Sequence, residues 1–254
     1  MPKLGIDPKV FWDRSNELAK EQHGDPIPTY MYQMLHEANH ARISMRKVDW
    51  EEHGRGISLF PGVASWFDRI NAAGVSRGID VHHYVISSGL HETVDGTIIQ
   101  KYFKAVFASA FLYDGSGVAD GKAVAVNYTT RIQYLFRINK NAMDLSDDKA
   151  VNAFQVFEKR AIPFPNIVFI GDGDTDIPYF RLIKKQGGHS IAVYPAGDPI
   201  RAERGLRLIT DGRVHCAVLA DYTESGDLER RVVAIFDLVA KRAIITAPVS
   251  VATL

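Results

Sequence analysis

Apolar residues recur at helical spacing through the N-terminal part of the chain. Asp7 followed by Pro8 has the pattern of a helix N-cap and a first helical residue, and a second helix is predicted after Pro28. A third helix is predicted over about residues 61–73, with Gly74 at its end. This part of the chain is therefore predicted to be helical.

From residue 81 onward, short apolar runs alternate with amphipathic stretches. The runs are residues 81–86, 167–170, 191–194 and 214–219. Such alternation is typical of a parallel sheet whose strands are joined by crossover helices.

Two further apolar segments lie between the first two runs. Residues 106–113 and 123–127 flank the sequence Asp-Gly-Ser-Gly at 114–117, which predicts an antiparallel hairpin. The last helix is predicted over about residues 228–240, with its apolar residues on one face. The fold class predicted from the whole pattern is α/β.

Charge and cysteine content restrict the classes of partner. Thirty Lys and Arg residues balance thirty Asp and Glu residues among 254, so the chain has no net field to attract nucleic acid or an anionic membrane. The single cysteine, Cys216, excludes an intrachain disulfide, and no apolar run approaches the roughly 20 residues that span a bilayer. We therefore expect a cytoplasmic protein with neither nucleic acid nor membrane as partner.

An acidic loop follows the apolar run at 167–170. Residues 171–176 have the sequence GDGDTD and place three carboxylates, Asp172, Asp174 and Asp176, at the end of a predicted strand. Ligands of parallel sheets bind at the carboxyl ends of strands, and a hard cation such as Mg²⁺ stabilises several ionised carboxylates held close together. A solvated turn with helix-capping acids is the alternative, but capping needs only one acid.

Two other loop types fail on spacing. An EF-hand would need Gly at the sixth position of the loop and Glu at the twelfth, where this chain has Ile177 and Ile183. A dinucleotide-binding loop would need a third glycine where Asp176 stands, and its acids would repel a pyrophosphate. A site for a divalent metal is the prediction that remains.

A second candidate site follows the run at 81–86. Ser87, Ser88 and Gly89 combine hydroxyl groups with backbone N–H groups at a strand end, an arrangement that suits a phosphoryl oxygen, although Ser-Ser-Gly is also a common turn. Arg131 opens a predicted helix after Thr129 and could add positive charge, although a lone helical Arg is more often a surface residue.

In this order, these segments resemble the haloacid dehalogenase superfamily, in its phosphoserine-phosphatase-like branch. The strand ending at Ser87 resembles the second motif of the family, Arg131 falls where the third motif has Lys, and residues 171–176 resemble the fourth motif. Arg keeps the charge of Lys but has a different geometry, so the third motif is a departure.

The resemblance implies a Mg²⁺-dependent phosphatase acting on a small phosphorylated metabolite. Asp172 would be the metal ligand, Asp176 its supporting acid, and Ser87 the hydroxyl that binds phosphate, while Asp174 receives no role. The implied fold is a three-layer Rossmann-like sheet, with residues 1–75 as a helical cap and residues 76–254 as the α/β core.

The first motif of the family, an apolar strand followed by Asp-x-Asp that carries the nucleophile, has no match ahead of Asp7. Residues 93–97 imitate its ending but place Thr93 at the nucleophile position, and a helix followed by a turn is the favoured interpretation there. The central strand is therefore expected to be absent and the 254-residue chain to be inactive.

Three explanations of the missing motif stay open. The start codon could be assigned too late, the gene could be a truncated remnant, or the protein could be a noncatalytic relative that binds a ligand or a partner. The nearly intact fourth motif favours the first. The sequence leaves the oligomeric state open.

Overall fold

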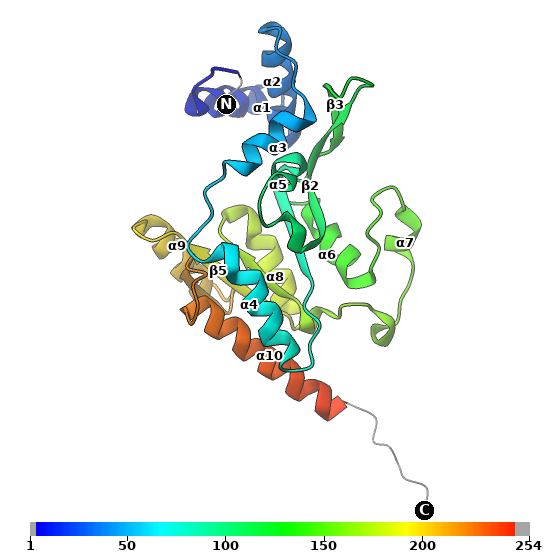
Figure 1. The fold of residues 1–254 in the computed structure, drawn as a ribbon, viewed down its shortest axis with the longest axis vertical. Coiled ribbons are helices and arrows are strands. Elements are labelled where there is room, and N and C mark those ends of the chain that lie inside the picture. Colours follow the sequence, from blue (N-terminus) through cyan, green and yellow to red (C-terminus); the bar gives the residue numbers. More distant parts are fainter. Residues whose placement is uncertain (1–3, 247–254) are drawn as a thin grey trace, which may run out of the picture. The chain divides into compact units, whose positions relative to one another are not determined.

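The computed structural model describes residues 4–246, apart from the side chains of Glu158, Asp174 and Thr246. Contacts divide the chain into two compact units, each built from two segments. Unit 1 comprises Met1–Ser58 and His83–Tyr134, and unit 2 comprises Leu59–His82 and Leu135–Leu254. The colours of Figure 1 follow the chain through both units, which are described separately below.

Unit 1 contains helices from the N-terminal segment and a small sheet from the second segment. Its elements are α1 (Pro8–Glu21), α2 (Pro26–His40), α3 (Lys47–Arg55), β1 (His83–Leu90), α5 (His91–Asp95), the 3₁₀ turn η1 (Gln100–Tyr102), β2 (Phe103–Tyr113) and β3 (Ala119–Val124). Helix α6 (Arg131–Lys140) contains the boundary between the units.

Unit 2 alternates strands and helices after its first helix. Its elements are α4 (Val63–Val75), α7 (Asp148–Asn152), the 3₁₀ turns η2 (Phe157–Lys159), η3 (Phe164–Asn166) and η4 (Asp174–Asp176), β4 (Val168–Gly171), α8 (Ile177–Lys185), β5 (His189–Tyr194), α9 (Pro199–Thr210), β6 (Cys216–Leu219) and α10 (Asp227–Thr246).

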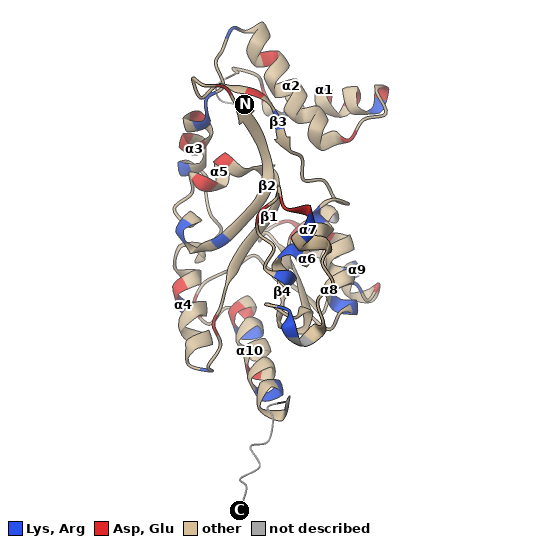
Figure 2. Ribbon diagram, turned by 90° about the vertical axis from the view of Figure 1, so that its right-hand side faces the viewer, with Lys and Arg blue, Asp and Glu red and all other residues tan. Residues whose placement is uncertain are grey.

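Charged residues of both signs are interspersed along the helices. Figure 2 shows acidic and basic residues alternating on α10, as expected of a chain whose charges balance. Among residues 4–246, no helix combines the length and the apolar character needed to cross a membrane.

The sheet of unit 1 has the order β1-β2-β3 and is mixed. β1 pairs in parallel with the first part of β2, placing Ser87 opposite Ala108, and the second part of β2 pairs antiparallel with β3. The connection from β2 to β3 is the predicted hairpin, closed by Asp114, whose carboxylate accepts hydrogen bonds from the backbone N–H groups of Ser116 and Val118. These bonds lower the pKa of Asp114.

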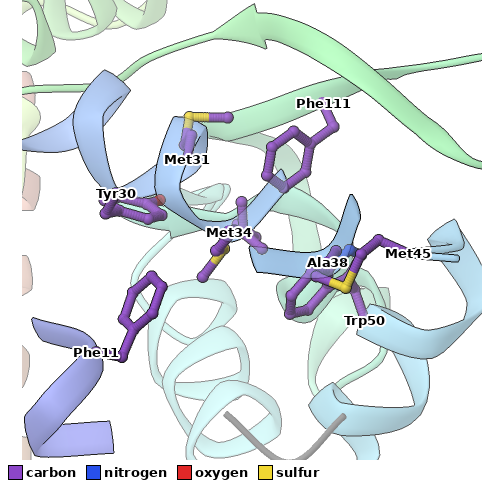
Figure 3. Packing of buried hydrophobic residues seen from close by; sticks show 9 residues of the cluster. Phe11, Tyr30, Met31, Met34, Ala38, Met45, Trp50 and Phe111 are labelled. Carbon is purple, nitrogen blue, oxygen red and sulfur yellow. The ribbon is translucent and has the colours of Figure 1, made fainter. Parts of the chain in front are cut away.

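The core of unit 1 lies between its helices and β2. Figure 3 shows apolar side chains from α1, α2, α3 and β2 directed toward one another. The buried members of this cluster are Phe11, Tyr30, Met31, Met34, Ala38, Met45, Trp50, Leu90 and Phe111. Each large side chain buried here contributes about 1.5–3 kcal/mol relative to leaving it in water, so the cluster fixes the helices on the sheet.

The sheet of unit 2 is parallel throughout, with the order β4-β5-β6. Ile191 in the central strand β5 is fully buried, and helix α8 covers the sheet with Tyr179, Phe180 and Ile183, which are also fully buried. Because the strands are parallel, their carboxyl ends lie at one edge of the sheet. The loops after β4, β5 and β6 therefore leave from the same edge.

Helices α4 and α10 lie side by side in unit 2, as both ribbon views show. Arg69 on α4 pairs with Glu229 on α10 at 2.9 Å, and Arg77 pairs with Asp237 at 2.6 Å. Asp237 thus serves a helix-to-helix ion pair, in agreement with its prediction as a helical residue.

The α/β class and most of the elements are confirmed, with corrections. The strands form two three-stranded sheets within the described residues, instead of the single sheet that the alternation suggested. The hairpin strand predicted at 123–127 lies earlier, at Ala119–Val124. Helix α4 continues through Gly74 to Val75, so Gly74 does not end the helix. A Cβ atom at Gly74 would lie 2.4 Å from Val81 Cγ2, so this glycine permits the close approach of Val81.

The predicted division into a cap of residues 1–75 and a core of residues 76–254 uses consecutive segments. The compact units are discontinuous instead, and they group helix α4 with the last 120 residues. The division into cap and core stays a prediction about domains.

Candidate functional site

The acidic loop lies at the carboxyl edge of the unit 2 sheet, where the sequence predicts it. β4 ends at Gly171, and the turn η4 leads directly into α8. Asp172 is at the surface, with its side chain 57% exposed, whereas Asp176 is buried. The two carboxylates therefore have different roles in the loop.

Asp176 holds the loop in place. Its Oδ2 atom accepts hydrogen bonds from the backbone N–H groups of Asp172 at 3.1 Å and of Gly173 at 3.2 Å. A Cβ atom on Gly171 would lie 2.5 Å from the same oxygen, so the close approach of the carboxylate requires glycine at 171. Asp176 is thus a supporting acid that positions Asp172.

The donor set of this loop fits Mg²⁺. Mg²⁺ is usually held by one or two carboxylates, together with water and the phosphate of a ligand, so a cage of protein ligands is not needed. Asp172 is accessible and Asp176 fixes its backbone. Among the side chains that the structure describes, no group of three His, Cys, Asp or Glu residues could hold a metal, and Asp174 lies outside that set.

Residues from the two following loops share this edge of the sheet with Asp172. Arg201, near the start of α9 after β5, places Nη1 3.9 Å from Asp172 Oδ2 and Nε 3.4 Å from Asp198 Oδ2. After β6, the half-buried Tyr222 has the pKa of its phenol raised to about 12, first by the loss of solvent around the hydroxyl and then by the negative charge of Asp172. The edge thus combines a carboxylate, a guanidinium and a neutral phenol.

Tyr222 is positioned by the segment that begins α4. Its backbone N–H donates to the carbonyl of Pro61 at 2.8 Å, and its carbonyl accepts from Arg69 Nη2. Its ring meets Trp66 edge to face at a centroid distance of 5.1 Å. These contacts fix the phenol relative to the sheet.

Ser87 and Gly89 lie in unit 1, at the end of β1. The backbone N–H of Gly89 donates to Ser87 Oγ at 3.0 Å, closing a local turn. The hydroxyl of Ser87 is half-buried and still has a proton to donate. One of the N–H groups predicted to meet a phosphate is therefore engaged with Ser87 itself.

Ser88 is tied to the core of unit 1. Its carbonyl accepts a hydrogen bond of 2.7 Å from the hydroxyl of Tyr30, whose pKa burial raises to about 12. The Ser88 Oγ atom is buried and has no hydrogen-bond partner among the described residues. Ser88 therefore anchors the strand end to α2.

Arg131 is the first residue of α6 and is buried, 7% exposed, so the alternative of a solvated surface arginine is wrong. The preceding loop prepares this helix start, because Asn127 Oδ1 accepts from the backbone N–H groups of Thr129 and Thr130. The N–H of Arg131 itself donates to the carbonyl of Asn127.

The candidate residues thus fall into two groups. Ser87, Ser88, Gly89 and Arg131 belong to unit 1, and Asp172 and Asp176 belong to unit 2. Within unit 2, the loop brings Asp172 and Asp176 together through the hydrogen bonds that the Asp176 carboxylate accepts.

Residues 93–97, the displaced copy of the nucleophile motif, lie at the end of a helix and in the turn after it. They complete α5 and the turn after it, where the carbonyl of Thr93 closely faces Gly54 on α3 and Asp95 pairs with His91 at 3.1 Å. The interpretation as a helix followed by a turn is confirmed.

Sequence reasoning missed Arg201 and Tyr222. A signal exists for both, since each follows a strand predicted to end at the same edge as Asp172. Neither residue belongs to a spacing motif, so only the strand topology identifies them.

Comparison with known proteins gives limited guidance. No family model matches the chain. A protein of Borreliella burgdorferi (strain ATCC 35210 / DSM 4680 / CIP 102532 / B31), named only as an uncharacterized protein, is 25% identical over 197 residues. The match covers 69% of this chain and 65% of that protein, so the chain spans less than two thirds of the length of this relative.

The fold should tolerate changes at Asp172 and at Ser87. Asp172→Asn and Ser87→Ala are each expected to change the free energy of unfolding by less than about 1 kcal/mol, because neither side chain is part of an apolar core. Thermal unfolding followed by circular dichroism checks this. Loss of a cooperative transition in either variant would identify that residue as structural.

Proposed function

We propose that the chain is a haloacid dehalogenase-like protein of the phosphatase type, which binds Mg²⁺ and a small phosphorylated metabolite in the cytoplasm. In its 254-residue form it does not hydrolyse phosphomonoesters. The order of motifs ending at Ser87, Arg131 and Asp172 supports the proposal.

The observation that carries the proposal concerns the edges of the two sheets. β1, which ends near Ser87, is an outer strand of its sheet, and β4, which ends at Asp172, is an outer strand of the other. No strand among the described residues pairs with the free edge of either one.

The composition of these two strands is unusual for outer strands. Both contain apolar residues of the kind found in strands covered on both faces, yet every residue of β4 is only half-buried. In the family, the strand with the nucleophile lies between the strands of the second and fourth motifs. An open apolar edge on each of these two strands supports the absence of a pairing partner beside it.

Each proposed residue would have a separate role in binding Mg²⁺ or the phosphate. Asp172 and Asp176 would hold Mg²⁺, which supplies charge neutralisation for a bound phosphate. Ser87 would donate a hydrogen bond to a phosphoryl oxygen beside Ser88 and Gly89, whose own N–H group donates to Ser87 Oγ, and Arg131 would supply positive charge. None of these side chains is a nucleophile for a phosphoryl group in this proposal.

Mg²⁺ binding tests the proposal directly. Asp172→Asn is expected to weaken Mg²⁺ binding by at least about tenfold, the effect typical of losing an important group at a metal site. Isothermal titration of the wild-type chain and the variant measures this, with Asp211→Asn, an exposed acid after α9, as the matched control. Equal affinities in wild type and Asp172→Asn would contradict the proposal.

A noncatalytic binding protein on the same fold is the second candidate. The helical conformation of residues 91–95 favours it, because this removes the one displaced copy of the nucleophile motif found in the sequence. A chain of this class would bind Mg²⁺ and phosphate but would stay inactive even when an additional strand is supplied.

A further inference from the structure

The carboxyl edge of the unit 2 sheet carries two groups that the sequence motifs leave without a role. Arg201 follows β5 and lies 3.9 Å from Asp172, and Tyr222 follows β6 at the same edge of the sheet. The three residues come from the loops after three adjacent strands, which is where ligands of parallel sheets bind.

Arg201 is placed between two carboxylates. Its guanidinium lies 3.9 Å from Asp172 and 3.4 Å from Asp198, and about half of its side chain is exposed. Both distances exceed those of a tight charge-assisted hydrogen bond, so the guanidinium neutralises the acids while its donors stay available. A guanidinium held loosely at a ligand edge is well suited to bind an anion.

Tyr222 complements Arg201 as an uncharged donor. Its ring is fixed by Trp66 and its backbone by Pro61 and Arg69, so the phenol points from a rigid base. No group among the described residues hydrogen bonds to its hydroxyl. A fixed phenol whose O–H group meets no acceptor among the described residues can donate to a ligand at a low ordering cost.

We propose that Arg201 and Tyr222 are ligand-binding residues of the Asp172 site. Arg201 is the counter-ion of Asp172 in this structure, and it would be released to bind the phosphoryl group of the ligand where Mg²⁺ neutralised Asp172. Tyr222 donates a hydrogen bond to the same ligand. This inference rests on the proposed function, since it takes Asp172 as the Mg²⁺ ligand.

If Arg201 exchanges Asp172 for the phosphoryl group, its removal should have opposite effects on the binding of Mg²⁺ and of phosphate. Arg201→Gln removes a positive charge next to the metal site, so Mg²⁺ should bind about threefold to fivefold more tightly, in line with the strength of half-exposed charge pairs. Arg207→Gln is the matched control, because Arg207 lies on the same helix and pairs with Glu203 at 2.7 Å. It should leave the Mg²⁺ affinity unchanged. An unchanged or lower Mg²⁺ affinity in Arg201→Gln would overturn the counter-ion role.

A metal-free titration with inorganic phosphate tests the anion role separately. Asp172→Asn releases Arg201, so phosphate should bind about threefold to fivefold more tightly than to wild type. Adding Arg201→Gln should abolish that gain, and adding Tyr222→Phe should reduce it. Equal phosphate affinities in Asp172→Asn and in Asp172→Asn with Arg201→Gln would overturn the inference.

The Mg²⁺ titrations and the metal-free phosphate titrations distinguish a failure of this inference from a failure of the proposed function. If wild type and Asp172→Asn bind Mg²⁺ equally, the proposed function fails, while the metal-free phosphate titrations still report on Arg201 and Tyr222. If Mg²⁺ binding depends on Asp172 but phosphate binding is indifferent to Arg201 and Tyr222, the inference alone fails. Far-ultraviolet circular dichroism of each variant confirms that the comparison is between folded chains.

Discussion

With saturating Mg²⁺, the 254-residue chain is expected to hydrolyse p-nitrophenyl phosphate at least about 10³-fold more slowly than a chain extended upstream of Met1 to include any apolar strand that ends in Asp-x-Asp. The physical reason is the absence of an assigned nucleophile. In the proposed function Ser87, Arg131 and Asp172 only bind and neutralise a phosphate, whereas covalent catalysis needs a group that forms a bond to phosphorus.

The open edges of β1 and β4 add a second reason for low activity. Each strand is the outer one of its own sheet, so in the proposed function Ser87 at the end of β1 and Asp172 after β4 are each held by strand pairing on one side alone. Residual positioning and electrostatics usually leave some rate above that of water, and even this part depends on a well-formed site.

A steady-state assay of both chains, with Asp95→Asn introduced into the shorter one, decides the matter. The Asp95 variant is the sharp control, because Asp95 is the acid of the displaced motif copy at residues 93–97. Rapid turnover by the 254-residue chain that Asp95→Asn abolishes would overturn the prediction and move the active site to that segment. Slow turnover that survives the substitution agrees with it.

Local signals in the sequence predict the elements that depend on local physics. Asp7 caps α1 with hydrogen bonds to the N–H groups of Lys9 and Val10, and Asp114 closes the hairpin turn, as their positions beside Pro8 and Gly115 indicate. The loop after β4 was also predictable, since three carboxylates after an apolar strand mark a strand end at the ligand edge.

Elements fixed by tertiary contacts were not predictable. Helix α3 has little apolar periodicity, and it depends on Trp50, which stacks on Phe111, and on Gly54, which lies against the carbonyl of Thr93. Both partners are far away in the sequence. Sequence periodicity carries no information about such contacts, so α3 was not recognised as a separate helix, although it lies in the part of the chain predicted to be helical.

The candidate site likewise contains residues that local sequence signals identify and residues that only the tertiary fold brings in. Asp172 and Asp176 are identified by their spacing, and the bonds from Asp176 to the loop backbone agree with the supporting role assigned from the resemblance. Arg201 and Tyr222 join them only because β5 and β6 lie beside β4 in the sheet. The order of strands is a property of the whole fold, which the apolar runs alone do not specify.

Gly62 links the start of α4 to Tyr222, and its substitution is expected to have the largest effect on the stability of unit 2. Its φ of +81° is strained for any L side chain, and a Cβ atom would lie 2.3 Å from the carbonyl carbon and oxygen of Tyr222. Gly62→Ala should therefore cost about 1–2 kcal/mol for the left-handed conformation and about 1–3 kcal/mol more for overlap with backbone.

Gly78→Ala is the matched control for this substitution. Gly78 also belongs to unit 2 and has a φ of +70°, but nothing lies within 4 Å of its would-be Cβ atom. Gly78→Ala should lower the free energy of unfolding only by the cost of the left-handed conformation, about 1–2 kcal/mol. Urea unfolding followed by circular dichroism measures both losses, and equal losses in the two variants would contradict a role for the contact with Tyr222.

The same pair of variants also tests whether Tyr222 is positioned by α4. Gly62→Ala should alter the near-ultraviolet circular dichroism that arises from Trp66, because the Tyr222 ring that meets it at 5.1 Å must move with its backbone. Gly78→Ala should leave that signal unchanged. If Gly62→Ala destabilises unit 2 without changing the aromatic signal, the glycine supports only the helix start, and Tyr222 owes its place to β6 instead.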